Sequence, residues 1–187
     1  MDGLALRNGI GFIKRLLGGK SNEQRVNLRL QMASGSRVLV VDDSPTICAV
    51  LGKMLGQDGY SVTKAPDGES AIELARNELP ALIFLDIVLP GINGFSVLRS
   101  LRQDPQTRHI PIVMISGNPQ ATEQFYVQRF GADDFIKKPF GRNEVAICID
   151  QLIRSGRLAA RDIAFEQMLA LAMMHDVKPG SLQSLAI

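Results

Sequence analysis

The chain has 187 residues, 45% of them hydrophobic and 5% aromatic, which suffices for one domain with additions and an aliphatic core. A net charge of +2 is too balanced to indicate nucleic-acid binding, and two widely spaced cysteines exclude a disulfide framework or a zinc site and fit a reducing cytosol. No apolar run reaches the ~18 residues of a membrane span and no secretion signal is visible, so we expect a cytoplasmic protein.

Residues 1–36 are predicted to be a basic extension and linker. Residues 1–37 contain seven basic and two acidic side chains. Four apolar residues recur there at helical spacing and would share one face of a helix: Leu6, Ile10, Ile13 and Leu17. Three basic residues would lie outside that face: Arg7, Lys14 and Arg15. Two interpretations stay open: an amphipathic helix that docks on a partner or a membrane surface, or a tail that packs loosely on the domain.

Residues 37–154 alternate between strand and helix patterns. Apolar runs bounded by turn residues predict strands over 37–42, 60–64, 81–86, 111–115 and 133–137. Amphipathic stretches predict helices near 45–57, 68–78, 94–103, 120–130 and 141–154. Ser44 is the expected N-cap of the first of these helices, with Pro45 in its first turn. This alternation predicts an α/β fold, in which a parallel sheet carries helices on both faces.

Residues 155–187 predict a C-terminal helical extension. Its methionines, Met168, Met173 and Met174, indicate a surface that adapts to partners. The alternative is a helix that extends or covers the last helix of the domain.

Acidic residues follow two of the predicted strands. The stretch LIFLDIVLPG, residues 82–91, places Asp86 where a buried strand meets a loop, and RVLVVDDSP ends in Asp42 and Asp43. The carboxyl ends of parallel strands form the ligand-binding edge of an open α/β sheet, so the three carboxylates are expected to converge there. Their mutual repulsion calls for a divalent cation, and Mg²⁺ is the leading candidate.

Two further polar residues end later strands. IVMISG places Ser116 just after the fourth strand, and DDFIKKPF places Lys138 just after the fifth. Phosphoryl transfer needs charge neutralisation and positioning, and this set can supply both. We expect Asp86 to be the nucleophile, Asp43 with Asp42 to hold the cation, and Lys138 and Ser116 to contact phosphoryl oxygens.

The segments VLVVDDSP, LDIVLPGINGF, MISG and GADDFIKKPF, in this order, resemble the receiver domain of bacterial two-component response regulators. The resemblance covers about residues 37–154 and implies a flavodoxin-like sheet with strand order 2-1-3-4-5. It implies that Asp42 and Asp43 are the acid pair that holds the cation and that Asp86 is the phosphoacceptor. It also implies that Ser116 is the switch hydroxyl and that Lys138 is the lysine that contacts the phosphoryl group.

The resemblance also assigns roles that the residue pattern alone does not reach. It makes the backbone carbonyl of Val88 a cation ligand and Phe135 the switch aromatic, and it makes a cis peptide bond before Pro139 an expectation. Asn93 stands where many receivers have Asp. The apolar side chain of Val88 leads to the hypothesis that no attacking water is positioned, so that the phosphorylated form decays slowly.

Implied partners are a histidine kinase as phosphodonor and a downstream motor or regulatory protein. A homodimer formed through the terminal helices is a further alternative. The match is closest in character to stand-alone regulators of twitching motility, the Pil-Chp group. The alternative is a chemotaxis or other single-domain receiver that acts as a phosphate sink or dimeric adaptor. Signalling would use the surface of the fourth helix, fifth strand and fifth helix of the domain.

Other function classes stay open. An acid-assisted phosphohydrolase is disfavoured because Val88, not an acid, stands two residues after Asp86. A nucleotide-binding enzyme is disfavoured because no glycine-rich phosphate loop follows a strand. An interaction module without phosphorylation is disfavoured by the intact acids, Ser116 and Lys138. We therefore expect a signalling protein and not an enzyme.

Overall fold

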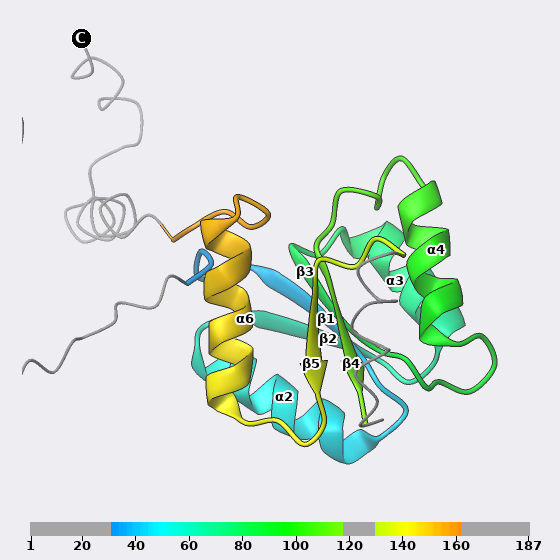
Figure 1. Ribbon diagram of the computed structural model, residues 1–187, viewed down its shortest axis with the longest axis horizontal. Coiled ribbons are helices and arrows are strands. Elements are labelled where there is room, and N and C mark those ends of the chain that lie inside the picture. Colours follow the sequence, from blue (N-terminus) through cyan, green and yellow to red (C-terminus); the bar gives the residue numbers. More distant parts are fainter. Residues whose placement is uncertain (1–30, 118–129, 162–187) are drawn as a thin grey trace, which may run out of the picture.

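The computed structural model describes residues 31–117 and 130–161, and their strands form one parallel sheet (Figure 1). The order is β2-β1-β3-β4-β5, as the resemblance implies. The strands are β1 (Arg37–Val41), β2 (Ser61–Ala65), β3 (Leu82–Asp86), β4 (Ile112–Ser116) and β5 (Asp134–Lys137). All paired strands are parallel, which confirms the predicted α/β class.

Helices cover both faces of this sheet. They are α2 (Pro45–Gln57), α3 (Gly68–Glu78), α4 (Gly94–Gln103) and α6 (Arg142–Arg154). Ser44 caps α2 as predicted, since its side chain accepts a hydrogen bond from the amide of Ile47, and Pro45 is the first residue of the helix. The predicted N-terminal helix, and the predicted helix 120–130 except for its last residue, lie outside the described residues. Of the predicted C-terminal helical extension, residues 155–161 are described and form turns and coil instead of a helix, and residues 162–187 lie outside the described residues.

Two apolar cores hold the layers together. One joins α2 and α6 to the sheet through residues such as Val40, Phe84 and Leu152, and the other joins α3 and α4 through residues such as Leu85 and Leu98. Every residue of β3 and β4 is buried, as expected for central strands covered on both faces. The strand ends that carry the predicted site are therefore held by packing on both sides.

The cores include residues on both sides of the segment 37–154. Met32 is 2% exposed and Leu158 is 7% exposed, and both belong to the core that faces α2 and α6. The Tyr60 hydroxyl accepts a hydrogen bond from the amide of Met32 at 3.2 Å. The amide of Arg161 donates to the carbonyl of Gln31 at 2.6 Å, so the flanking segments lie side by side (Figure 1).

Candidate functional site

The polar residues predicted at the strand ends meet at one edge of the sheet. Asp42 follows β1, Asp86 is the last residue of β3, and Lys138 follows β5. Ser116 was expected just after the fourth strand, but it is the last residue of β4, because its backbone still pairs with β5 at Lys137. It is 1% exposed, so its hydroxyl belongs to the buried end of the strand.

Three carboxylates form an acidic cluster at this edge. Asp42, Asp43 and Asp86 each offer an oxygen within 4.8 Å of the others. Asp42 and Asp86 are buried, at 1% and 4% exposure, whereas Asp43 is exposed. The backbone amide of Ser44 donates to Oδ1 of Asp42 at 2.9 Å and so fixes this carboxylate against the start of α2. The sequence prediction that these three acids converge is confirmed as geometry.

Lys138 joins the two buried acids. Its ammonium donates to Oδ2 of Asp86 at 2.8 Å and lies 2.7 Å from Oδ2 of Asp42. Its backbone amide donates to the carbonyl of Ser116 at 2.6 Å, which ties the end of β5 to the end of β4. The peptide bond from Lys138 to Pro139 is cis, as the resemblance leads one to expect.

Burial and charge shift the protonation equilibria of this group. Burial raises the pKa of Asp86, the charge of Asp42 raises it further, and the hydrogen bond from Lys138 opposes both effects. Burial by itself lowers the pKa of Lys138, but the carboxylates of Asp42 and Asp86 outweigh it, so that this pKa is raised. The lysine therefore remains charged at neutral pH and neutralises part of the acidic cluster.

The acidic cluster fits a magnesium ion. Hard carboxylate oxygens are the ligands that Mg²⁺ takes, usually one or two together with waters and phosphate oxygens. Oδ2 of Asp42 is buried and has only the ionic contact with Lys138, without a hydrogen bond of good geometry. Two buried carboxylates against one ammonium leave negative charge that a cation would neutralise. The amide of Val88 lies 3.4 Å from Oδ1 of Asp86, while its side chain is 71% exposed.

Some supporting contacts were not found from the sequence. Gly94 starts α4 so close to β3 that an added Cβ would lie 2.1 Å from the carbonyl oxygen of Asp86. The Cys48 thiol donates to the carbonyl oxygen of Asp42 at 3.3 Å. In the sequence, Gly94 could be recognised only as part of the loop motif after the third strand. Nothing in the sequence indicated that Cys48 contacts the acids. Asn93 caps α4 by accepting from the amide of Ser96, so the loop accepts Asn in place of Asp.

Phe135, the expected switch aromatic, lies in the middle of the edge strand β5. It is partly buried and packs against the core that faces α3 and α4. Its backbone amide donates to Oδ1 of Asp134 at 2.8 Å. Its role as the switch aromatic stays a prediction.

Comparison with known proteins adds an independent line of support. The family model described as the response regulator receiver domain matches residues 38–150. Protein PilH of Pseudomonas aeruginosa is 41% identical over 104 residues, which cover 56% of this chain and 86% of PilH. The response regulator PleD of Caulobacter vibrioides is 40% identical over 104 residues, but these cover only 23% of PleD.

Solved structures agree in fold. A crystal structure of the receiver domain of a sensor histidine kinase from Pseudomonas aeruginosa, with a magnesium ion coordinated in its active site cleft, has a TM-score of 0.60 and 30% identity, and the match covers 65% of this chain and 99% of that one. The chemotaxis protein CheY4 of Vibrio cholerae has a TM-score of 0.59 and 27% identity, with 65% and 98% covered. Within the described residues, every helix is too short or too polar to cross a bilayer. The chain belongs to the response regulator receiver-domain family of two-component systems.

Proposed function

We propose that the chain accepts a phosphoryl group on Asp86 from a histidine kinase and signals through protein–protein contacts. The observation that carries this proposal is the contact of one ammonium, that of Lys138, with two buried carboxylates, Asp42 and Asp86. An arrangement of this kind suits a site that receives a dianionic group, because it supplies a nucleophile, a cation and a place for a second cation.

The chemistry follows from the residues at the strand ends. A carboxylate oxygen of Asp86 forms a bond to phosphorus while the bond from phosphorus to the donor's nitrogen breaks. Lys138, already held near Asp86, moves its charge toward the phosphoryl oxygens as they arrive, and Ser116 donates a hydrogen bond to one of them. Asp42, Asp43, Asp86 and the carbonyl of Val88 would hold Mg²⁺, which when bound neutralises phosphoryl charge.

The response is a shift between two conformations of the domain. In the phosphorylated form Ser116 moves toward the phosphoryl group and Phe135 fills the space it leaves. Because Phe135 belongs to β5, this movement changes the surface formed by β5, α6 and the predicted helix 120–130. Phosphorylation thereby favours a pre-existing minor conformation and its partner.

The pathway that we propose is type IV pilus twitching motility, with a cytoplasmic regulator that binds a motor or regulatory protein. The likeness to PilH and to stand-alone regulators of that group supports it. We also propose that residues 1–36 and 155–187 are additions to the receiver domain, and that the segments 31–36 and 155–161 stabilise it because Met32 and Leu158 lie in its core. A chemotaxis regulator or phosphate sink is the alternative.

The direct test uses acetyl phosphate as a small donor in the presence of MgCl₂. We expect stable acyl-phosphate label on the parent chain and on Asp150→Asn, a control on α6 whose carboxylate pairs with Arg154 away from the site. We expect none on Asp86→Asn, and none on the parent when the metal is chelated. Label that persists in Asp86→Asn contradicts the proposal, and continuous phosphate release without stable label identifies a phosphohydrolase instead.

A further inference from the structure

The loop between β1 and α2 carries two of the three acids and is held by several polar contacts. The backbone amide of Asp42 donates to the carbonyl of Ala65 in β2 at 3.1 Å. Oδ1 of Asp42 accepts from the amide of Ser44 at 2.9 Å, and Oδ2 lies 2.7 Å from the ammonium of Lys138. Asp43 has an exposed side chain, yet it offers an oxygen within 4.8 Å of those of the other two acids. The place of that carboxylate therefore depends on how the backbone on either side of it is fixed.

Cys48, in the first turn of α2, holds this loop at two points. Its thiol donates to the carbonyl oxygen of Asp42 at 3.3 Å, and its backbone amide donates to the carbonyl oxygen of Ser44 at 3.1 Å. The residue is 7% exposed, so the bond from the thiol is shielded from water. The thiol thus fixes the peptide group before Asp43, and the bond from the Ser44 amide to the Asp42 carboxylate fixes the one after it.

The thiol keeps the proton that it donates. Burial raises the pKa of Cys48 and the charge of Asp42 raises it further, so the thiol is protonated at neutral pH. Mg²⁺ takes hard oxygen ligands, whereas thiolates select softer metals, so Cys48 is not suited to bind the cation itself. Any effect of Cys48 on the cation therefore passes through the backbone of the acids.

We propose that Cys48 is a positioning residue for the metal-binding acids, because its thiol fixes the peptide group between Asp42 and Asp43 and so directs the Asp43 carboxylate toward the cation. This inference rests on the proposed role of these two acids in holding Mg²⁺. Replacing a residue that orients metal ligands commonly changes metal affinity by about 10–100-fold. A thiol is a weak donor, so we expect the lower end of this range, about tenfold.

The physical reason is the cost of leaving the Asp42 carbonyl without this bond in a residue that is only 1% exposed. A buried carbonyl without a partner is unfavourable, so the peptide group is expected to rotate toward another donor or toward water. That rotation changes the backbone angles of Asp43 and moves its carboxylate relative to the other two acids. Because Mg²⁺ demands near-ideal geometry, a shift of this kind weakens its binding.

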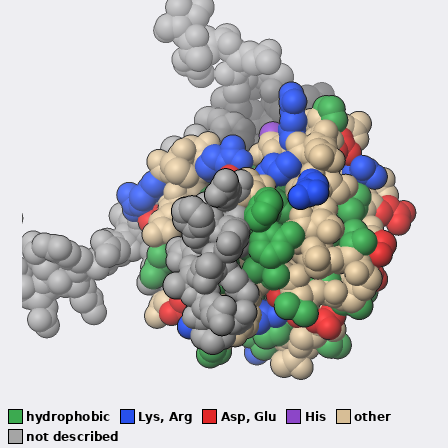
Figure 2. Space-filling model, turned by 45° about the vertical axis from the view of Figure 1, so that its right-hand side comes forward, with side chains coloured by type: hydrophobic (Ala, Val, Ile, Leu, Met, Phe, Trp, Pro, Cys, Tyr) green, Lys and Arg blue, Asp and Glu red, His purple; other side chains and the backbone are tan. Residues whose placement is uncertain are grey.

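The test compares Cys48→Ala with Cys48→Ser in the full chain, because these side chains differ by one hydroxyl and only serine keeps a donor. Titration with MgCl₂ is followed by NMR on the signals of Asp42 and Asp43. Figure 2 shows Asp and Glu side chains exposed at several places on one face of the molecule, and a bulk measurement would also count Mg²⁺ held weakly by them. We expect the alanine variant to bind Mg²⁺ about tenfold more weakly than the parent, and the serine variant to bind within about twofold of it.

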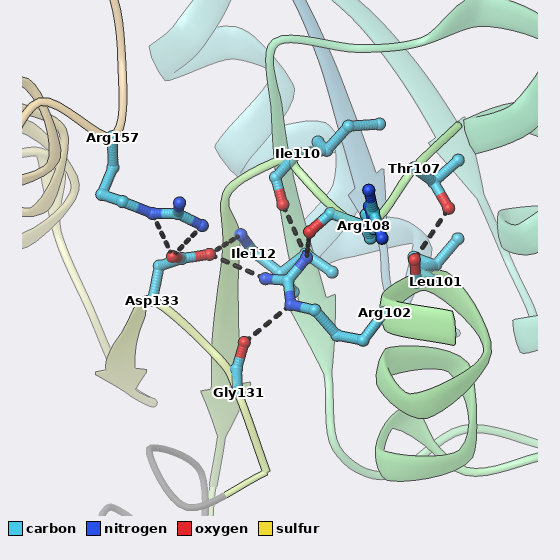
Figure 3. Close-up of polar contacts among 9 residues, drawn as sticks. All are labelled: Leu101, Arg102, Thr107, Arg108, Ile110, Ile112, Gly131, Asp133 and Arg157. Atoms are coloured by element: carbon cyan, nitrogen blue, oxygen red, sulfur yellow. Dashed lines mark hydrogen bonds and ion pairs between the residues drawn. The ribbon is translucent and has the colours of Figure 1, made fainter. Parts of the chain in front are cut away.

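The matched control lies at the opposite edge of the sheet, where β4 and β5 begin (Figure 3). At this edge Asp133 accepts from Arg102 at 2.8 Å and from Arg157 at 2.6 Å. Nearby, the hydroxyl of the buried Thr107 donates at 2.9 Å to the carbonyl of Leu101, six residues earlier, which is the separation that the thiol bond in α2 also spans. Thr107→Val removes this bond and nearly keeps the shape of the side chain. It should lower the urea midpoint and leave the affinity for Mg²⁺ unchanged.

The outcomes separate this inference from the proposed function. An affinity of Cys48→Ala for Mg²⁺ equal to that of the parent overturns the inference and leaves the proposed function intact. Absence of Mg²⁺ binding at the acids of the parent overturns the metal site of the proposed function, and the inference with it. A loss of affinity in Thr107→Val as large as that in Cys48→Ala assigns the effect to lower stability and overturns the inference alone.

A measurement on metal-free protein tests the hydrogen bond by itself. The NMR chemical shift of the Asp42 carbonyl carbon should change in Cys48→Ala and stay near the parent value in Cys48→Ser. Equal shifts in the parent and the alanine variant contradict the bond from the thiol. Serine and alanine variants that bind Mg²⁺ equally weakly, with the carbonyl shift kept in serine, show a packing role for Cys48 and overturn the inference as well.

Discussion

Gly94 begins α4 against the strand end that carries Asp86, and its replacement by alanine tests how tightly that end is held. The new Cβ would lie 2.1 Å from the carbonyl oxygen of Asp86 and 2.9 Å from Cα of Ile87. These are backbone atoms, so no rotamer change relieves the contact. Normal contact needs roughly 3.5 Å, and the two segments must therefore separate by about 1 Å or more.

This displacement is expected to fall on the loop after β3. The helix is anchored by Val97, Leu98 and Leu101, which are at most 1% exposed, whereas the bond from the Gly94 amide to the Ile87 carbonyl, at 3.0 Å, lies at the clash itself. Overpacking of this kind costs about 1–3 kcal/mol of folding free energy. If the Asp86 carboxylate moves by about 1 Å relative to Lys138, phosphoryl acceptance should fall by up to about a hundredfold.

The matched control is Gly56→Ala in the last turn of α2. An added Cβ there has no atom within 4 Å, so alanine should stabilise the helix by about 0.5–1 kcal/mol. Urea unfolding gives the free energy of unfolding of both variants, and labelling by acetyl phosphate, normalised to the folded fraction, gives the rate. If Gly94→Ala unfolds at the parent's urea midpoint and is labelled at the parent's rate, the close approach does not constrain the acceptor.

Three further results are expected. Met32→Ala should lower the free energy of unfolding by about 2–5 kcal/mol because Met32 is 2% exposed in the core, whereas the exposed Gln31→Ala should change it by less than about 0.5 kcal/mol; equal urea midpoints would place residue 32 outside the core. Val88→Asn should shorten the lifetime of the acyl phosphate, because the amide can orient an attacking water where the exposed valine cannot; an unchanged rate of label loss would count against this role. In metal-free protein, NMR titration should give Asp86 a pKa above the ordinary ~3.9, and Lys138→Ala should raise this pKa further because the ammonium is the group that opposes burial. Acceptance of phosphate should therefore fall as pH decreases through that raised pKa, and a pKa below the ordinary value would refute the assignment of burial as the dominant cause.

Local patterns were sufficient to predict a parallel sheet and the edge of it at which the three acids meet. A strand buried on both faces needs an uninterrupted apolar run, so LIFL and IVMI were recognisable without any structure. Parallel strands point their carboxyl ends to one edge, so the acids, Ser116 and Lys138 were expected to converge there. The cap of α2 at Ser44 was predicted for the same local reason, since it depends on residues within one helical turn.

Contacts between distant residues were decided only by the tertiary structure. That Lys138 reaches both Asp42 and Asp86 depends on how three strands are paired, because lysine and acceptor are 52 positions apart in the chain. Three other features also depend on contacts between distant parts of the chain. They are the clash that excludes a side chain at residue 94, the sharing of Asp133 by two arginines, and the burial of Met32 and Leu158 in one core. Hydrophobic periodicity in the sequence shows which face of a helix or strand is buried. It does not show which residues cover that face, because this is decided only when the helices and the sheet pack together.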